Sequence, residues 1–155
     1  MTRAEFDDAF QRHMTWLLTG GKAGAQGNFR GAALDGFNLH GHTLEGADFE
    51  GCSLRGAELI RADLSRANLR GADLSGAFMH RALLVEADLT GADLTAAELN
   101  HADLERARLA GANLAGADLH EARLDDADLA GARLDGAMVD GAMVDGALGL
   151  AGGTA

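Results

Sequence analysis

Histidine and cysteine are the side chains of this sequence that could bind a metal or act as nucleophiles. His40, His80 and His120 recur at intervals of forty residues, and the chain has a single cysteine, Cys52. Imidazole nitrogens and thiolate sulfurs are common zinc ligands, and a thiolate is also a nucleophile. What these groups can do depends on the elements that position them.

A glycine-rich stretch around Lys22, with the sequence GGKAGAQG, is a further candidate for chemistry. A phosphate-binding loop cradles phosphates with its backbone N–H groups, but it requires the spacing G-x-x-x-x-G-K-[ST]. Lys22 is followed by Ala23, so the required Ser or Thr is absent. The stretch therefore does not predict nucleotide binding.

The remainder of the chain is organised by a hydrophobic residue at every fifth position. This period runs from Phe29 to Val144 through 24 centres without an insertion, and the unit reads A-(D/N)-L-x-G. A period of five fits neither an α-helix, whose apolar face recurs every 3.6 residues, nor a β-strand, whose side chains alternate every two. Many short units in phase indicate a solenoid, in which each unit buries its apolar residues against its neighbours.

This pattern resembles the pentapeptide-repeat family. The resemblance implies an all-β solenoid: a right-handed quadrilateral β-helix with one repeat on each side and four in each coil. On this basis residues 27–146 form the β-helix, with about six four-repeat coils. Residues 1–26 are expected to form an N-terminal capping helix and linker, and residues 147–155 a flexible C-terminal tail.

Residues twenty apart should stack in columns if four repeats make a coil, and we name the four sides by their first centres, Phe29, Leu34, Leu39 and Leu44. Two residues after each centre, the Phe29 and Leu34 sides are almost all glycine, whereas the other two sides carry charged residues or histidine in their middle coils. Glycine readily takes the positive φ of the third residue of a type II turn, which Arg, Glu and His resist. The sequence therefore predicts two turn types, segregated by side.

The columns separate the candidate metal ligands from one another. His40, His80 and His120 share a column but lie two coils apart, about 10 Å by strand spacing, whereas each ligand of a zinc ion lies about 2 Å from it. His101 and His120 are closer, but with Glu121 they make only a weak surface site. We expect no metal site here.

No nucleophile, base and orienting group come together in this pattern. Cys52 stands two residues before Leu54, where other coils place alanine, and this predicts a small buried core residue. We expect no catalytic residue, no cofactor and no enzymatic activity.

The N-terminal residues 2 to 19 read as an α-helix. Thr2 and Glu5 form a capping-box pattern. Apolar residues follow at helical spacing, at Phe6, Phe10, Met14 and Leu17. We expect this helix to cover the first coil, because an open solenoid end exposes apolar side chains and unpaired backbone groups.

The C-terminal end of the repeats is expected to be less well covered, because the phase of five is lost after Val144. An apolar end of this kind favours a tail-to-tail homodimer through the C-terminal coil, as in several members of the family that the chain resembles. The alternative is a tail that folds back over the opening. The candidate dimer residues are Met138, Val139, Met143, Val144 and Leu148.

A net charge of −11 opposes direct binding to nucleic acid or to an anionic membrane surface. No run of about 18 apolar residues predicts a transmembrane segment, and the N-terminus lacks the pattern of a secretory signal. We therefore expect a bacterial-type cytoplasmic protein with a protein partner.

Negative charge is concentrated on the Leu44 side, which carries eight acids against three arginines. An acidic rod resembles the pentapeptide-repeat proteins that bind DNA gyrase by imitating DNA and protect it from inhibitors. Asp or Asn before the centre belongs to the family consensus, so acidity accompanies the fold in any case. The candidate acids are Glu45, Asp63, Glu86, Asp103, Glu105, Asp125, Asp126 and Asp145.

Four apolar residues interrupt the polar surface of the Leu39 and Leu44 sides. Phe78 and Leu83 stand where Asp, Asn or Glu usually precede the centre, and Ile60 and Val85 lie at neighbouring outward positions. We call these four residues the apolar patch. It is either a protein-docking surface or tolerated surface variation. We expect a rigid scaffold for protein–protein interaction, with a DNA-mimicking regulator of gyrase as the alternative.

Overall fold

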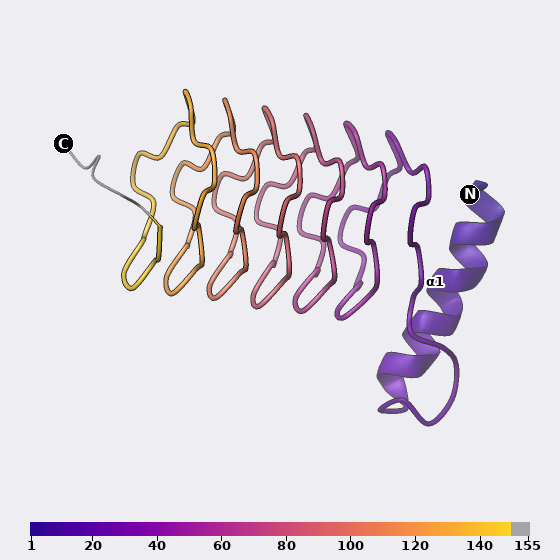
Figure 1. The fold of residues 1–155 in the computed structure, drawn as a ribbon. Coiled ribbons are helices and arrows are strands. Elements are labelled where there is room, and N and C mark those ends of the chain that lie inside the picture. The colour runs from indigo at the N-terminus through magenta and orange to yellow at the C-terminus, as the bar shows by residue number, and fades with distance from the viewer. Residues whose placement is uncertain (150–155) are drawn as a thin grey trace.

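The computed structural model describes residues 1–149 as one helix followed by a stack of coils (Figure 1). Helix α1, Arg3–Leu18, begins at a capping box. The Thr2 hydroxyl accepts a hydrogen bond from the Glu5 N–H at 3.2 Å, and the Glu5 carboxylate accepts one from the Thr2 N–H at 2.7 Å. The predicted helix and capping box are thus confirmed. Within the described residues, no helix has the length and apolar character needed to cross a membrane.

Each coil takes twenty residues, because every β-bridge is parallel and joins residues twenty apart. The bridges run from Asn28, which pairs with Asp48, to Asp128, which pairs with Leu148, and each repeat contributes the residue before its centre. Backbone bonds run along the stack, as where the Asp48 N–H donates to the Gly27 carbonyl at 2.8 Å. Each side between two turns is too short for more than one bridge, so the coils contain isolated bridges rather than extended strands.

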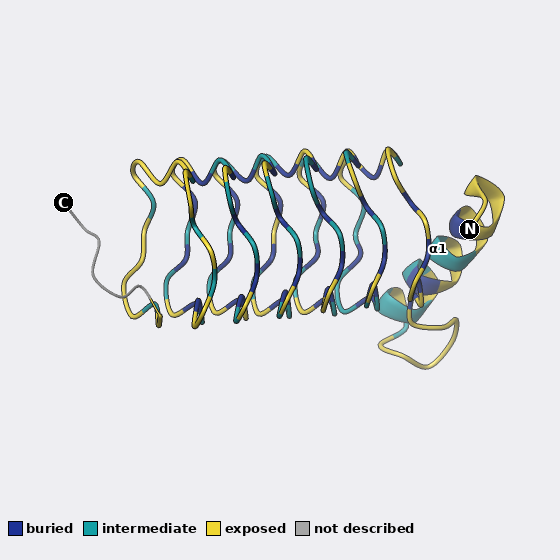
Figure 2. Cartoon of the chain, turned by 45° about the horizontal axis from the view of Figure 1, so that its top comes forward, coloured by how far each residue is buried: buried dark blue, intermediate teal, exposed yellow. Residues whose placement is uncertain are grey.

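The core is a continuous cluster of buried apolar side chains, and the backbone segments that carry buried residues recur from coil to coil (Figure 2). Every centre from Phe29 to Leu129 is buried, and so is the alanine that stands two before most of these centres. Cys52 occupies one of the alanine positions and is buried, as predicted. A buried leucine-sized side chain contributes about 1.5 to 3 kcal/mol of hydrophobic free energy, which is opposed by the conformational entropy of ordering the chain.

The third residue of every turn has a positive φ, whichever side it belongs to, so the prediction that the sides differ at this residue is wrong. The third residue has a positive φ at every turn position from 31 to 146, whether it is Gly31 at +62°, Arg61 at +56° or His101 at +58°. The N–H of this residue donates to the next coil, as from Arg61 to His80 at 2.9 Å and from His101 to His120 at 2.9 Å. The hydrogen-bond ladder between coils thus imposes the conformation, at a cost of about 1 to 2 kcal/mol for a residue other than glycine.

Helix α1 packs across the first coil through aromatic and imidazole side chains (Figure 1). The Phe6 ring stacks on the Phe29 ring with centroids 4.9 Å apart, and both side chains are buried. His13 is buried too, and its Nδ1 accepts a hydrogen bond from the Gly27 N–H at 3.0 Å. These contacts tie the helix to the beginning of the repeats.

The ladder extends past its predicted end at residue 146. Ala147 and Leu148 keep the inward and bridging positions of another repeat, and only Gly149 departs from the pattern by lacking a side chain at the centre. Bridging depends on backbone groups, so the changed centre does not prevent it. The inward centres Val139 and Val144 are 51% and 36% exposed, because no further coil covers them in the described part. Residues 150–155 of the predicted tail lie outside the described residues.

Candidate functional site

Asp and Asn before the centre have a structural role on the outer surface. One Asp73 carboxylate oxygen accepts from the Ser75 N–H at 3.1 Å, and Asp93 accepts from the Thr95 N–H at 3.0 Å and from the Thr95 hydroxyl. The Thr95 hydroxyl and N–H hold the pKa of Asp93 below its ordinary value. These bonds span two residues and are Asx turns. Acidity at this position therefore belongs to the fold and does not by itself mark a binding face.

Three arginines offset part of the negative charge of the Leu44 side. At its turn positions Arg66, Glu86, Arg106 and Asp126 alternate in sign through consecutive coils. The closest N–O distances along this series are 3.6, 3.8 and 4.0 Å. Arg66 also lies 3.1 Å from Glu45. Exposed pairs of this kind contribute little to stability, but they reduce the negative potential.

Arg123 pairs with a second group of acids on the same side. Its guanidinium lies 2.9 Å from Asp103, 2.7 Å from Glu105 and 3.7 Å from Asp125. Six of the eight candidate acids thus have a guanidinium within 4.0 Å. In the part of the chain that the structure describes, the two without one are Asp63 and Asp145.

The apolar patch lies on two adjacent sides of two adjacent coils. Phe78, Leu83 and Val85 belong to one coil and Ile60 to the preceding coil. Phe78 is 39% exposed and Leu83 is 42% exposed, whereas Ile60 and Val85 are half-buried. Neither Phe nor Leu can accept the turn-closing hydrogen bond that Asp accepts elsewhere. Both positions therefore combine exposed apolar area with the loss of a local hydrogen bond.

Arg61 and Arg81, at the corner between the two sides of the patch, differ from the other arginines. Ten of the twelve arginines have a carboxylate oxygen within 4.0 Å. Within residues 1–149, Arg61 and Arg81 have none. Both arginines flank the patch in the sequence. They are also successive members of one column, so a neighbour of each at the turn position is another arginine and not an acid.

The histidines lie in the columns of the coils, apart from His13, which belongs to α1. The His80 Nε2 is 2.8 Å from a Glu98 oxygen. Glu121 lies between two imidazoles, 3.1 Å from His101 Nδ1 and 3.4 Å from His120 Nε2, and these two rings are 6.2 Å apart. Among the described residues, no three or more His, Cys, Asp or Glu side chains are arranged to hold a metal ion.

Cys52 lacks the environment of a reactive thiol. Burial, the largest cause, raises its pKa to about 11. At neutral pH the thiol is therefore protonated, whereas nucleophilic cysteines are thiolates.

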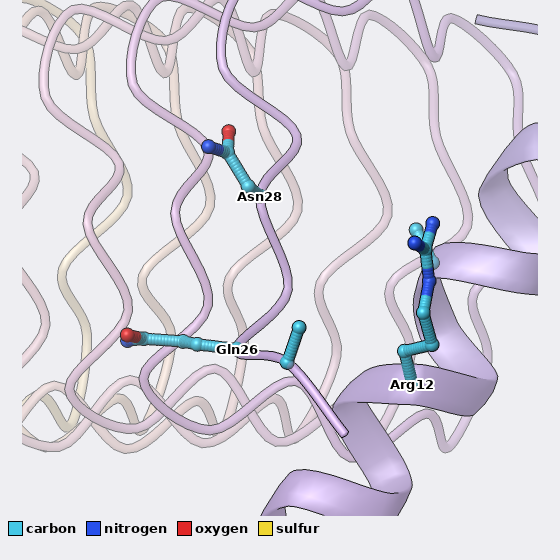
Figure 3. A pocket seen from close by; sticks show the side chains of 5 residues that line it. Arg12, Gln26 and Asn28 are labelled. Carbon is cyan, nitrogen blue, oxygen red and sulfur yellow. The ribbon is translucent and has the colours of Figure 1, made fainter. Parts of the chain in front are cut away.

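A hollow of about 150 Å³ lies beside α1, lined by Ala9, Arg12, Ala25, Gln26 and Asn28. The three side chains labelled in Figure 3 do not point toward one another. Arg12 pairs with Asp8 at 2.7 Å, and the Gln26 amide donates to the Gly46 carbonyl. The hollow thus presents one paired guanidinium and two amides, without a nucleophile or a base among its lining residues.

The exposed C-terminal coil presents the predicted dimer residues to solvent. Among its bridging residues and centres, the exposed ones include Met138, Val139, Met143, Val144 and Leu148. In the middle coils, by contrast, every centre is buried.

Known proteins share this architecture. The family model for pentapeptide repeats matches overlapping segments that together run from residue 28 to residue 138. The chain belongs to the pentapeptide-repeat family. Its members are right-handed β-helix proteins. The predicted family and this coarse fold class are thereby confirmed.

Two solved pentapeptide-repeat structures illustrate the range of the likeness. The pentapeptide-repeat protein Rfr23 from the cyanobacterium Cyanothece 51142 is 30% identical, with a TM-score of 0.56, over 77% of this chain and 89% of that chain. QnrB1, a plasmid-mediated fluoroquinolone resistance protein, is 20% identical in one trypsin-treated form, with a TM-score of 0.59, over 77% of this chain and 66% of that chain. Among curated proteins, no sequence matches significantly. The likeness to QnrB1 is one of fold.

Proposed function

We propose that this pentapeptide-repeat protein is a rigid, non-enzymatic scaffold that binds a protein partner through the apolar patch. The observation that carries the proposal is the exposure of Phe78 and Leu83, at 39% and 42%, in positions where other repeats close a turn with Asp or Asn. Burying a large apolar side chain contributes about 1.5 to 3 kcal/mol, so a partner that covers both residues gains hydrophobic free energy. Hydrogen bonds between coils hold the backbone of both residues, which limits the entropy cost of binding.

The double variant Phe78→Asp with Leu83→Asp tests this proposal. Each Asp can close the Asx turn of its repeat, so the fold should persist while the apolar area is lost. A matched control is Ala33→Asp with Thr43→Asp, which adds two acids at the same repeat position in the first coil. Both variants should retain the circular dichroism spectrum of the parent chain.

Affinity capture from cells of the source organism, with the parent chain and both variants as bait, gives the readout. We expect a partner that the parent and the control retain and the patch variant loses. A partner bound equally by all three chains would contradict the assignment of the patch.

The second candidate function is mimicry of DNA toward DNA gyrase by the acidic Leu44 side. The excess of acids on this side and the likeness in fold to a fluoroquinolone resistance protein favour it. The row of carboxylates could occupy a basic groove built for phosphates. The arginines that pair with six of the eight acids count against it, because they lower the potential that such mimicry requires.

A gyrase supercoiling assay separates the two candidates. Under DNA mimicry, added protein should inhibit the enzyme or protect it from a fluoroquinolone, more strongly at low than at high salt. Replacing four acids by their amides should remove that effect, and the four are Asp103, Glu105, Asp125 and Asp126. Absence of any effect at large excess of protein would eliminate gyrase as the partner.

We also propose that α1 caps one end of the coils and that the exposed C-terminal coil forms a homodimer. Support for the cap comes from the Phe6 and His13 contacts with the first coil. Support for the dimer comes from the exposed centres Val139 and Val144. Sedimentation should give a dimer mass, and Val139→Asp with Val144→Asp should give a monomer. A monomer mass for the parent chain at high concentration would contradict the dimer.

A further inference from the structure

Arg61 and Arg81 place two unpaired positive charges in successive coils of an acidic protein. Their backbones are adjacent, since the Arg61 N–H donates to the carbonyl of His80, the residue before Arg81. Successive coils are about 4.8 Å apart, so like charges face each other here. On the neighbouring side the same turn positions alternate between Arg66 and Glu86, which lie 3.6 Å apart. Within the described residues, the corner between the Leu39 and Leu44 sides thus carries two guanidiniums that no carboxylate within 4.0 Å compensates.

Both arginines also occupy a strained backbone conformation. Each has a φ of +56°, which costs about 1 to 2 kcal/mol for a residue with a side chain. Gly41 holds the same turn position one coil before Arg61, and a Cβ added there would meet nothing within 4 Å. A side chain at this position therefore projects into open space. Glycine would satisfy the turn without strain, so the fold does not need the two guanidiniums.

The carboxylates nearest in the ladder contact other groups. Asp63, which bridges Leu83, accepts a hydrogen bond from the Ser65 N–H at 3.0 Å. Glu98 contacts His80 at 2.8 Å, and Asp103 contacts Arg123 at 2.9 Å. Glu58 accepts a hydrogen bond from the Asn38 amide at 2.7 Å. These acids flank the bridging residues of the patch, yet none lies within 4.0 Å of the two arginine side chains. The guanidiniums therefore keep their donors for an external acceptor.

The two arginines adjoin the exposed apolar residues. Arg81 stands between Phe78 and Leu83 in the same coil, and Arg61 follows Ile60 in the preceding coil. The corner thus combines unpaired guanidinium donors with exposed apolar side chains. A guanidinium binds a carboxylate through two parallel hydrogen bonds, which gives both affinity and orientation.

We propose that Arg61, Arg81, Phe78 and Leu83 together bind an extended partner segment that presents carboxylates beside large apolar side chains. The inference rests on the proposed scaffold function and specifies the chemistry of the partner. In an extended segment, alternate side chains point the same way about 6.6 Å apart, a spacing that two flexible arginines one coil apart can meet. Carboxylates at alternate positions would bind the arginines, and apolar residues of the segment would cover Phe78 and Leu83.

Fluorescence polarisation with an array of synthetic peptides tests the proposal. The probes carry Glu at alternate positions and Leu or Phe among the others, and each has a comparator with Gln for Glu. We expect the acidic peptides to bind more tightly than the comparators, and more tightly at low salt. Equal binding of both series, or binding of none of the acidic peptides, would overturn the proposal.

The double variant Arg61→Gly with Arg81→Gly tests the residues, because glycine suits a positive φ and the fold should be retained. The control is Arg66→Gly with Arg106→Gly, which removes two paired arginines from the same turn position of the adjacent side. The first variant should bind the acidic peptides at least about tenfold more weakly, the loss expected for one charge-assisted hydrogen bond. The control should bind like the parent chain. An equal loss in both variants would indicate a nonspecific charge effect and would refute the assignment.

Partner capture with the same variants separates failure of this inference from failure of the scaffold function. A partner lost by Phe78→Asp with Leu83→Asp but kept by Arg61→Gly with Arg81→Gly leaves the scaffold function standing and refutes the acidic segment. A partner that both double variants retain would refute the apolar patch as the binding site and the acidic segment as its ligand. If the parent chain sediments as a dimer that Arg61→Gly with Arg81→Gly dissociates, the occupant is a second copy of the chain and the proposal is wrong.

Discussion

Replacing Ala96 with glycine should stabilise the coils, although the change removes a methyl group. Ala96 has a φ of +54° and stands at a turn position where Gly76 and Gly116 occupy the neighbouring coils. A left-handed backbone costs a residue with a Cβ about 1 to 2 kcal/mol. Glycine avoids this cost but loses about 0.5 to 1 kcal/mol through the extra freedom of the unfolded chain. The net expectation is a stabilisation of about 0.5 to 1 kcal/mol.

The reciprocal change Gly76→Ala isolates the same effect with opposite sign. A Cβ at Gly76 would meet nothing within 4 Å, so the substitution introduces backbone strain without a clash. We expect a destabilisation of about 0.5 to 1 kcal/mol. Ala97→Gly is the control, because Ala97 is buried and its φ is not positive; there glycine should destabilise.

Urea unfolding followed by circular dichroism measures all three variants. A shift of the midpoint at constant slope reports a change in stability, whereas a changed slope would indicate that unfolding of the stack is not two-state. If Ala96→Gly destabilised the protein and Gly76→Ala had no effect, the turn position would carry no strain. Arg61 and Arg81, which stand at the same kind of turn position, would then cost the fold nothing either.

Three further predictions follow from the buried residues. Burial lowers the pKa of His13 against a smaller opposing effect of Glu45. The folded state therefore binds fewer protons than the unfolded state. The stability contributed by neutral His13 is fully present above pH 6.5, the ordinary pKa of histidine, and should fall as the pH drops below that value. Thermal unfolding from neutral pH to about pH 5 measures this loss. The loss of stability at low pH should be smaller in the His13→Leu variant. Identical pH profiles of the melting temperature in the variant and the parent chain would contradict this role of His13. Cys52, with a pKa raised to about 11, should react with a thiol reagent at neutral pH far more slowly in the folded than in the urea-unfolded chain; equal rates would contradict its burial. Leu104→Ala should destabilise by about 2 to 5 kcal/mol and Leu134→Ala by less, because Leu104 is fully buried whereas Leu134 is half-buried near the uncovered end. Equal losses in denaturant unfolding would show that the end coil is covered.

The five-residue period was sufficient to predict which side chains point inward. The stacking of residues twenty apart was predicted from the resemblance to the pentapeptide-repeat family, which implies four repeats in each coil, and the columns of turn residues agreed with it. The sequence was not sufficient to predict the turns. Arg61 and Glu121 resist a positive φ as isolated residues, yet both adopt it, at +56° and +53°. The hydrogen bonds between coils decide the conformation here, and intrinsic preference adds only a cost.

Two features of the candidate sites were missed for different reasons. His13 is buried because it continues the helical spacing of Phe6 and Phe10, and the apolar pattern passed over it because histidine is polar. The contrast between paired and unpaired arginines depends on which residue stands one coil away. Arg66 has Glu86 in the next coil, whereas Arg61 has Arg81. Whether an arginine has an acid or another arginine one coil away can therefore be determined from the columns, although the distances between the side chains require their conformations.

The pairing of residues twenty apart sets a rule for how the chain can change in length. Deleting five residues from the middle of the stack would turn every later repeat onto the next side, so that the outward residues downstream would change face relative to those upstream. Deleting twenty would shorten the rod by one coil, about 4.8 Å, and leave every side aligned. The distance between two sites on one side can therefore change in steps of one coil without a change in the core. The number of coils between two binding surfaces sets their spacing.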